Sequence, residues 1–437
     1  MTHSLTAAGF AEDDVRTRAR DGAAAVFPPH EGYGRQLFGA DAAADGGRGA
    51  DPLDALRLVP PVFVPRRLEK MIELAREPYY SDVDLSTGLG GFRSTAPLYV
   101  SAFGSTQVAA SGLGAAVSRQ AGRLGIPMVV GENIVPTSGH HGSGAENGAL
   151  ARLGAYESEL PDGVGGVAFQ QSTEDADAEV WNLIYSAPAA QRLLESGRLA
   201  FELKVGQGAK PGLGGMTVVD TASAARLAEH YATDDLYGDG RHVLRSSSPG
   251  TFTEEILRQQ IRFMRNNYPR ARVWVKLPPG RDVRHAAATA WEAGADAVTV
   301  DGAEGGSGWA PLSFLGHVGL PLGECLRRMR AWDQQHCLLV SGRMWEGTRV
   351  AKCLALGARA AGLGRAALLA VDENPDDGLG RLVSSLLLEL RLIISALGKY
   401  APADLGPEDV WDGRGPFSAS PSPSLSPSPA HSTTRDP

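Results

Sequence analysis

Short apolar runs recur along the middle of the chain, and each ends at glycines or small polar residues. They predict strands over 98–103, 128–130, 199–205, 273–277, 297–300, 338–340 and 360–363. The stretches between them predict helices over 108–124, 188–196, 222–230, 252–267, 283–293, 320–335, 346–356 and 380–397. Thr251 and Glu254 have capping-box spacing at the start of one helix. This alternation predicts a parallel sheet, and the number of units favours a (β/α)8 TIM barrel over an open doubly wound sheet.

The two ends of the chain do not follow this alternation. Residues 1–60 are rich in Ala, Gly, Asp and Pro without a sustained period, which predicts a loosely structured N-terminal arm in front of a barrel over 61–412. Ten of the twelve residues from 418 to 429 are Ser or Pro. Such a composition buries too little apolar surface to offset its ordering entropy, so 413–437 are expected to form a disordered C-terminal tail.

Composition and charge exclude several classes of protein. The 42 Lys and Arg stand against 50 Asp and Glu with no basic stripe, so no nucleic-acid groove is expected. Three cysteines, none in a C-x-x-C pair, argue against a disulfide framework or a zinc ribbon and suit a reducing compartment. The N-terminus lacks signal-peptide features, and the apolar stretch 382–397 carries Glu389 and Arg391. We therefore expect a cytoplasmic protein without a membrane partner.

Glycine is over-represented and gathers behind the predicted strands. It supplies 54 of the 437 residues, against an average of about 7%. The segments 301–308, 341–343 and 362–368 each place glycines directly after a late strand. Exposed backbone N–H groups and helix N-termini bind anions, and barrels often hold phosphate after their last strands. A single glycine is explained by a tight turn, but three such loops predict a phosphate site.

Charged and polar residues at other strand ends are candidates for chemistry. Lys276 ends the strand 273–277 and points either to the rim or into the barrel mouth. A glycine-rich loop over 206–215 follows Lys204 and carries Gln207 and Lys210, which could hold an anionic substrate. Glu132 ends the strand 128–130. Adjacent histidines at 140 and 141 lack metal-ligand spacing, so no metal site is predicted.

Five segments, in this order and spacing, resemble the FMN-binding synthase domain of glutamate synthases. They are FELKVGQGAKPGLGG (201–215), VWVKL (273–277), VDGAEGGSG (300–308), VSGRMWEGTR (340–349) and GLGRAALLA (362–370). The resemblance covers residues 90–400 approximately and implies a (β/α)8 barrel with FMN across its C-terminal mouth. In that family the reduced flavin passes hydride to 2-iminoglutarate, which forms from 2-oxoglutarate and ammonia.

The resemblance also implies roles for individual residues of this chain. Ala102 and Ser105 would back the flavin ring, and Lys276 would lie at its N1/O2 edge. The ribityl chain and phosphate would contact Gly305, Gly306, Ser307, Gly342, Arg343, Gly364 and Arg365. The residues that would face the substrate are Lys204, Gln207, Lys210 and Glu132.

The chain departs from the family pattern in three places. Residues 370–377 stand where the family has its cluster cysteines, so no iron–sulfur cluster is expected. No glutamine amidotransferase domain with an N-terminal cysteine nucleophile is expected either. The segments 131–133, 216–220 and 244–251, which would contact the substrate, differ from the family pattern, whereas the segments that would contact the flavin match it. The substrate is therefore predicted only as an amino or imino acid.

These observations predict an FMN-dependent oxidoreductase that transfers a hydride between flavin and the α-carbon of an amino or imino acid. Two alternatives remain open: an FMN barrel oxidase or isomerase that acts on a hydroxy acid, and a non-catalytic FMN-binding partner subunit. Without a cluster, electrons would come from the substrate, a diffusible reductant or an electron-transfer partner. An ammonia-supplying partner and assembly into a homo-oligomer are both compatible with this prediction.

Overall fold

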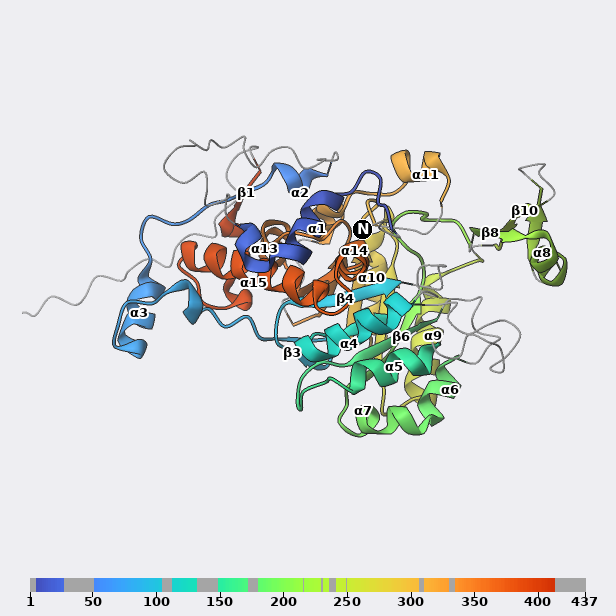
Figure 1. The fold of residues 1–437 in the computed structure, drawn as a ribbon, viewed down its shortest axis with the longest axis horizontal. Helices are drawn as coiled ribbons and strands as arrows, with labels where there is room; N and C mark the ends of the chain where they lie inside the picture. The colour runs from blue at the N-terminus through green and yellow to red at the C-terminus, as the bar shows by residue number, and fades with distance from the viewer. Residues whose placement is uncertain are drawn as a thin grey trace, which may run out of the picture.

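A closed eight-stranded parallel barrel forms the centre of the molecule (Figure 1). The structure, a computed structural model, describes residues 5–26, 51–103, 112–131, 148–171, 180–214, 216–228, 231–235, 241–248, 250–305, 310–329 and 335–412. Around the barrel the strands follow the order β11-β12-β13-β14-β4-β5-β6-β7. They are β4 (Leu98–Phe103), β5 (Met128–Val130), β6 (Val167–Gln171), β7 (Leu199–Lys204), β11 (Arg272–Leu277), β12 (Ala297–Asp301), β13 (Leu338–Ser341) and β14 (Ala360–Leu363). The predicted (β/α)8 barrel is confirmed.

The eighth strand, β6, is the one that the apolar pattern did not reveal. Its five residues are all buried, but only Val167, Ala168 and Phe169 are apolar. Gln170 and Gln171 follow them and are buried as well. A strand with only three apolar residues, followed by two buried polar ones, does not stand out in the sequence.

Helices surround the barrel. They are α4 (Gly114–Leu124), α5 (Ala149–Glu157), α6 (Val180–Ser186), α7 (Gln191–Glu195), α9 (Glu254–Asn267), α10 (Val283–Glu292), α12 (Leu322–Met329), α13 (Gly347–Ala355), α14 (Arg365–Glu373) and α15 (Gly378–Ala396). The cap of α9 differs from the prediction. Thr253, not Thr251, is the extended N-cap residue, and its hydroxyl accepts a hydrogen bond from the Ile256 N–H. Glu254 is therefore the first helical residue, where it pairs with Arg258 at 2.7 Å.

A short hairpin closes the N-terminal end of the barrel. It consists of β2 (Thr87–Leu89) and β3 (Phe92–Ser94), and it packs on the lowest inward-facing residues of the barrel strands. The Trp274 indole donates to the Gly90 carbonyl at 2.9 Å. A Cβ on Gly90 would lie 2.5 Å from the same indole, and its φ is +55°, so only glycine fits there. Because this end is plugged, chemistry is restricted to the C-terminal mouth.

Two described segments of the first 60 residues pack against the barrel. The helix α1 (Glu12–Asp21) buries Val15 and Ala19. Its Arg16 pairs with Asp372 on α14 at 3.2 Å. The short helix α2 (Pro52–Ala55) follows Asp51, which caps it and is buried. Both segments differ from the loosely structured arm expected for 1–60, whereas the expected tail over 413–437 lies outside the described residues.

Two further elements lie at opposite ends of the molecule (Figure 1). One is an antiparallel sheet of β8 (Met216–Asp220), β10 (His242–Ser246) and β9 (Ala232–Asp234), accompanied by α8 (Thr221–Leu227). The other is the helix α3 (Pro65–Leu74). The pair β1 (Arg57–Leu58) and β15 (Val410–Trp411) and the helix α11 (Leu312–His317) complete the periphery. Among the described residues, no helix combines the length and apolar character needed to cross a membrane.

Candidate functional site

Polar side chains fill the barrel interior near its C-terminal mouth. Inward-facing positions alternate along each strand, so Ala297 lies in the apolar lower layer, and Thr299 and Asp301 follow on the same face. The same alternation places Lys276 above Trp274 on β11. The buried polar residues of this layer are Gln170, Glu202, Lys276, Thr299, Asp301 and Ser341. Buried polar groups persist only when they are hydrogen-bonded or paired, so their partners define the site.

Lys276 forms a buried ion pair with Asp301. The Lys276 Nζ lies 3.3 Å from Asp301 Oδ2, and the two side chains are 7% and 6% exposed. Asp301 also accepts hydrogen bonds from the Ser341 hydroxyl and, at 2.9 Å, from the Gly208 N–H. Burial alone would raise the pKa of Asp301, but the Lys276 ammonium and these donors outweigh it and lower the pKa. The arrangement fixes one cation beside the mouth.

Glu202 is a second buried carboxyl group in this layer. It accepts hydrogen bonds from Gln170 Nε2 at 2.5 Å and from Thr299 Oγ1 at 3.2 Å. Burial raises the pKa of Glu202, although the Lys276 ammonium and both hydrogen bonds act in the opposite direction. Sequence reasoning missed Glu202. Its position two residues before Lys204 on the same strand face was the available signal.

The glycine-rich loop after β7 lies against the loop after β12. A Cβ on Gly208 would lie 1.9 Å from the Gly302 carbonyl oxygen, so the two backbones meet without a side chain between them. The predicted substrate residues are on and before this loop: Lys204, Gln207 and Lys210 are all half-buried. Lys204 is in register with Lys276 on the neighbouring strand. Lys210 donates to the Met216 carbonyl at 3.1 Å.

The loops directly after β12, β13 and β14 form a corner that is suited to bind an anion. We call this the anion corner. Gly364 is the N-cap of α14, whose first N–H groups have no partner within the helix. Arg365 Nη2 donates to the Glu304 carbonyl at 2.7 Å, and its guanidinium lies 4.5 Å from the centre of the Phe10 ring. Across the described ranges, no carboxylate forms an ion pair with Arg365. Burial, reinforced by the Arg343 guanidinium, lowers the pKa of Arg365. A half-buried cation at a helix N-terminus favours a phosphate.

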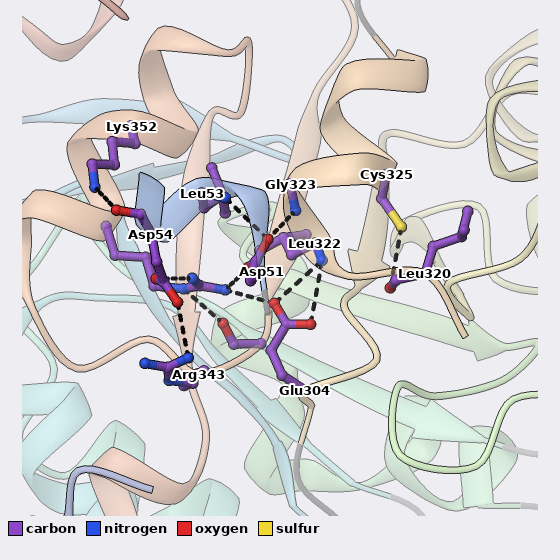
Figure 2. A network of polar contacts seen from close by, with 12 residues as sticks. Asp51, Leu53, Asp54, Glu304, Leu320, Leu322, Gly323, Cys325, Arg343 and Lys352 are labelled. Atoms are coloured by element: carbon purple, nitrogen blue, oxygen red, sulfur yellow. Dashed lines mark hydrogen bonds and ion pairs between the residues drawn. The ribbon is translucent and has the colours of Figure 1, made fainter. Parts of the chain in front are cut away.

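A network of carboxylates and arginines holds this corner in place (Figure 2). Arg349 Nη2 lies 2.5 Å from Asp51 Oδ2 and 2.6 Å from Glu304 Oε1. Arg349 Nη1 lies 3.0 Å from Asp54 Oδ1, and its Nε donates to the Gly342 carbonyl at 3.2 Å. We call Asp51, Asp54, Glu304, Arg343 and Arg349 the carboxylate network. It joins the segment before the barrel to the loops after β12 and β13.

Two carboxyl groups of the carboxylate network have pKa values shifted from their ordinary values. Burial and the neighbouring Asp51 raise the pKa of Glu304 to about 8. Burial would also raise the pKa of Asp51, but the Arg349 guanidinium reverses the effect and lowers it. Glu304 also accepts hydrogen bonds from the Leu322 N–H at 3.2 and 3.3 Å. The carboxyl group therefore links the β12 loop to α12.

The structure brings most of the predicted cofactor positions to the mouth. Gly305 donates to the Gly302 carbonyl at 2.8 Å, and Gly342 has a φ of +132°. Arg343 has a φ of +55°, and its Nη1 lies 3.0 Å from Asp54 Oδ2, so the protein itself holds one edge of this guanidinium. Ala102 is half-buried near the end of β4. Four predicted residues lie outside the described residues: Glu132, Ser105, Gly306 and Ser307.

Part of this site lies in a region that is similar to known proteins. Residues 189–373 match the family model described as a conserved region in glutamate synthase. An archaeal-type glutamate synthase [NADPH] from Thermotoga maritima is 34% identical over 184 residues, which are 39% of this chain and 34% of that relative. A glutamate synthase large subunit-like protein from Rhizobium meliloti is 32% identical over 198 residues, 40% of each chain. The chain thus spans well under half the length of these relatives.

Solved structures are similar over most of the chain but at low identity. An oxidised active mutant of (S)-mandelate dehydrogenase has a TM-score of 0.55 and 18% identity, with 92% of this chain and 99% of that chain covered. The flavin-binding domain of baker's yeast flavocytochrome b2 has a TM-score of 0.54 and 16% identity, with 88% and 85% covered. These similarities concern the barrel fold alone. The sequence match is more specific than the fold: residues 189–373 of this barrel are similar to the conserved region of glutamate synthases.

Proposed function

We propose that the chain is an FMN-dependent oxidoreductase of the glutamate synthase type, which transfers a hydride to or from the α-carbon of an amino or imino acid. One observation carries the proposal: the region that matches the family, 189–373, runs from just before α7 to the last residue of α14. It therefore contains Lys276, the glycine-rich loop and the whole anion corner. Most of the buried polar residues of the mouth lie within the matched region, and Gln170 lies outside it.

The residues present fit the phosphate and ring of FMN. Arg365, Gly364 and the first turn of α14 would bind the phosphate, because they combine a half-buried cation with the N–H groups of a helix N-terminus. Lys276 would stabilise negative charge at the pyrimidine edge of the ring, since Asp301 holds its ammonium in place. When bound, FMN supplies the hydride acceptor or donor. Ser105, Gly306 and Ser307 complete the proposed cofactor contacts.

The glycine-rich loop supplies the proposed substrate contacts. Lys204 and Lys210 would bind a carboxylate of the substrate, and Gln207 would orient its amino or imino group. The half-buried position of these side chains lets them reach a ligand that enters from solvent. Glu132 is proposed as a fourth substrate residue. Glu202, buried and with a raised pKa, is suited to hold a proton in the hydrogen-bond network below them.

We also propose that the chain works in the cytoplasm without an iron–sulfur cluster. The residues from 370 to 377 comprise the end of α14 and the turn into α15 and contain no cysteine. Cys325 and Cys353 are buried, and burial raises the pKa of each thiol to about 12. We further propose that a partner protein supplies electrons or ammonia.

An anaerobic reduction experiment tests this function. The purified chain is loaded with FMN, and the flavin absorbance is followed as amino acids, 2-hydroxy acids and reduced nicotinamides are added in turn. The proposal expects bleaching by at least one amino acid and none by hydroxy acids. A matched sample with Lys204→Met should keep its flavin and lose the response to amino acids, because the change removes a cation that binds the substrate carboxylate.

Two outcomes contradict the proposal. Bleaching by 2-hydroxy acids alone would assign the chain to the hydroxy-acid alternative, which shares the same barrel fold. A chain that binds FMN but responds to no reductant, with or without candidate partner proteins, would support the non-catalytic subunit.

A further inference from the structure

Arg365 differs from the central arginine of the carboxylate network in the kind of partner it has. Arg349 lies within ion-pair distance of three carboxylates. Arg365 is half-buried at the first position of α14, and the described part of the chain gives it one hydrogen-bond acceptor, the Glu304 carbonyl. Its other close contact is aromatic, because its guanidinium carbon lies 4.5 Å from the centre of the Phe10 ring. A residue near the start of the chain therefore contacts the cation of the anion corner.

An aromatic partner has a different consequence for Arg365 from that of a carboxylate. The face of an aromatic ring attracts a guanidinium without neutralising its charge. A carboxylate in the same place would form an ion pair and compete with an anionic ligand for the cation. The N–H donors of a guanidinium lie in one plane, and the Glu304 carbonyl accepts a hydrogen bond from Nη2 alone. The Phe10 ring thus restrains Arg365 and leaves its charge to a ligand.

A short turn before α1 brings Phe10 to this position. Gly9 has a φ of +73°, which favours glycine, so the chain turns directly before the ring. The Phe10 N–H donates to the Ala7 carbonyl at 3.0 Å, and the Ala7 N–H donates to Glu12 Oε2 at 2.7 Å. Phe10 is half-buried and packs against the hydrophobic core. These contacts fix the backbone that carries the ring.

Residues 5–21, which we call the N-terminal segment, are also attached to the other end of α14. Arg16 pairs with Asp372, one residue before the end of α14, at 3.2 Å, and the two side chains are 4% and 5% exposed. Arg16 also donates to the Leu5 carbonyl at 2.7 Å. A buried ion pair is costly to break by removal of one partner. In Figure 1, α1 lies beside α14. The segment thus holds α14 near both ends, and its Phe10 contacts the first residue.

We propose that Phe10 is a positioning residue of the anion corner, which holds the Arg365 guanidinium where this cation binds the phosphate of FMN. This role rests on the proposed function, because FMN is the ligand of the corner. It makes the N-terminal segment a part of the cofactor site, although the segment lies outside the matched region 189–373. Because Phe10 acts through Arg365, its effect should be specific to a ligand that carries a phosphate.

The first test titrates the flavin-free full chain with FMN and with riboflavin, which lacks the phosphate. Phe10→Ala should raise the dissociation constant for FMN by about 3- to 30-fold and leave that for riboflavin unchanged. The unchanged riboflavin affinity shows that the variant is folded. Phe263→Ala on α9 is the matched control, since Phe263 is 50% exposed and should affect neither flavin. Equal weakening of both flavins by Phe10→Ala, or no weakening of FMN, would overturn the proposal.

Two further variants separate the contact between ring and cation from simple packing. Phe10→Tyr keeps an aromatic face and should bind FMN as the wild type does. Phe10→Leu keeps an apolar side chain of similar size without a ring, so it should weaken FMN nearly as much as Phe10→Ala does. Wild-type affinity for FMN in Phe10→Leu would show that the ring serves packing alone, which contradicts a positioning role.

A double-variant cycle tests whether Phe10 acts through Arg365. In an Arg365→Ala background, Phe10→Ala should cause no further loss of FMN affinity. A full additional loss would show that the two residues act independently and would contradict the proposal.

The same titrations distinguish a failure of this role from a failure of the proposed function. A wild type that binds FMN and riboflavin equally, or binds neither, would contradict the phosphate site and the role of Phe10 together. If the wild type prefers FMN and Arg365→Ala abolishes this preference while Phe10→Ala does not, the proposed function stands and the role of Phe10 is wrong.

Discussion

The two sides of the barrel mouth are built differently. On the side of β11 to β14, two cations are buried and paired, Lys276 with Asp301 and Arg349 with three carboxylates, while Arg365 is half-buried. On the side of β7, Lys204, Gln207 and Lys210 are half-buried on or before a loop whose glycines let it lie on its neighbour. Fixed groups suit a cofactor that stays bound, whereas reachable groups suit a substrate that enters and leaves. We call these the cofactor side and the substrate side.

The comparison also explains why the cofactor is easier to infer than the substrate. The anion corner consists of short loops directly after β12, β13 and β14, and these loops lie inside the matched region. The substrate side leads into the antiparallel sheet of β8, β10 and β9, which a plain barrel does not have. A substitution on the cofactor side should therefore disturb flavin binding or stability. A substitution on the substrate side should disturb substrate affinity.

Removal of the central arginine of the carboxylate network should have the largest effect. Arg349→Met leaves Asp51 and Glu304 buried without their shared cation, which is expected to lower the free energy of unfolding by about 3–5 kcal/mol. Urea unfolding measures this loss of unfolding free energy. Arg327→Met is the control, because Arg327 is 58% exposed and should change stability by less than about 0.5 kcal/mol. Equal stability of the two variants would show that the network does not brace the cofactor side.

Loss of the buried lysine should abolish most of the chemistry while the flavin stays bound. Lys276→Met removes the cation beside the ring and should slow flavin reduction by about 10²–10³-fold. Stopped-flow absorbance measures the rate, and flavin content is measured on the same sample. Because the change leaves Asp301 unpaired, Lys276→Met/Asp301→Asn serves as the folding control. A reduction rate equal to that of the wild type would contradict the role given to Lys276.

The arginine at the start of α14 should govern phosphate binding. Arg365→Ala removes a charged donor from the anion corner and should raise the dissociation constant for FMN by roughly 10- to 100-fold. Flavin fluorescence titration of the flavin-free protein measures it. Arg381→Ala on α15 is the control, since Arg381 is 47% exposed and pairs with Asp377. Unchanged FMN affinity in Arg365→Ala would show that the phosphate does not bind at the anion corner.

The raised pKa of Glu304 predicts a pH dependence of stability. Its pKa in the folded protein is about 8, above the ordinary value of 4.5. The stability from its bound proton is fully present below about pH 4.5 and is lost as the pH rises through about 8, with a total of at most about 5 kcal/mol. The lowered pKa of Asp51 acts only in the acid range. The melting temperature is measured as a function of pH, and Glu304→Gln should flatten its slope. An unchanged slope in this variant would show that another group causes the pH dependence.

The smallest effect is expected on the substrate side. Lys210→Met should raise KM for a carboxylate substrate by roughly threefold to tenfold, because one half-buried charged contact is lost. Steady-state kinetics measure KM and kcat separately, and kcat and FMN affinity should not change. If Lys210→Met weakens FMN as strongly as Arg365→Ala does, the division between the two sides is wrong.

Local patterns in the sequence were sufficient for most of the barrel. Seven strands and the glycine loops behind them depend on neighbouring residues, so they could be identified directly. The strand β6 was missed because its last two residues, Gln170 and Gln171, are polar although both are buried, and the α9 cap was placed two residues early because Thr251 and Thr253 both offer a hydroxyl. Short-range spacing cannot choose between two such caps.

The carboxylate network could not be predicted from the sequence. Arg349 and Asp51 are 298 positions apart, and no pattern in a single sequence joins them. Asp51 lies in a region whose composition indicated a loose arm, and its burial depends on packing against α12. The inward position of Glu202 could have been predicted from the alternation along β7. Its partners Gln170 and Thr299 come from two other strands, so these contacts could not be predicted.

The account depends most on phosphate recognition by the cofactor side. The most direct measurement compares the dissociation constants of FMN and riboflavin for the flavin-free wild-type chain, because the two ligands differ only in the phosphate. Charge-assisted bonds from Arg365 and the start of α14 predict that FMN binds about 100-fold more tightly. Equal affinity for the two flavins, or binding of neither, would contradict an FMN site in this barrel.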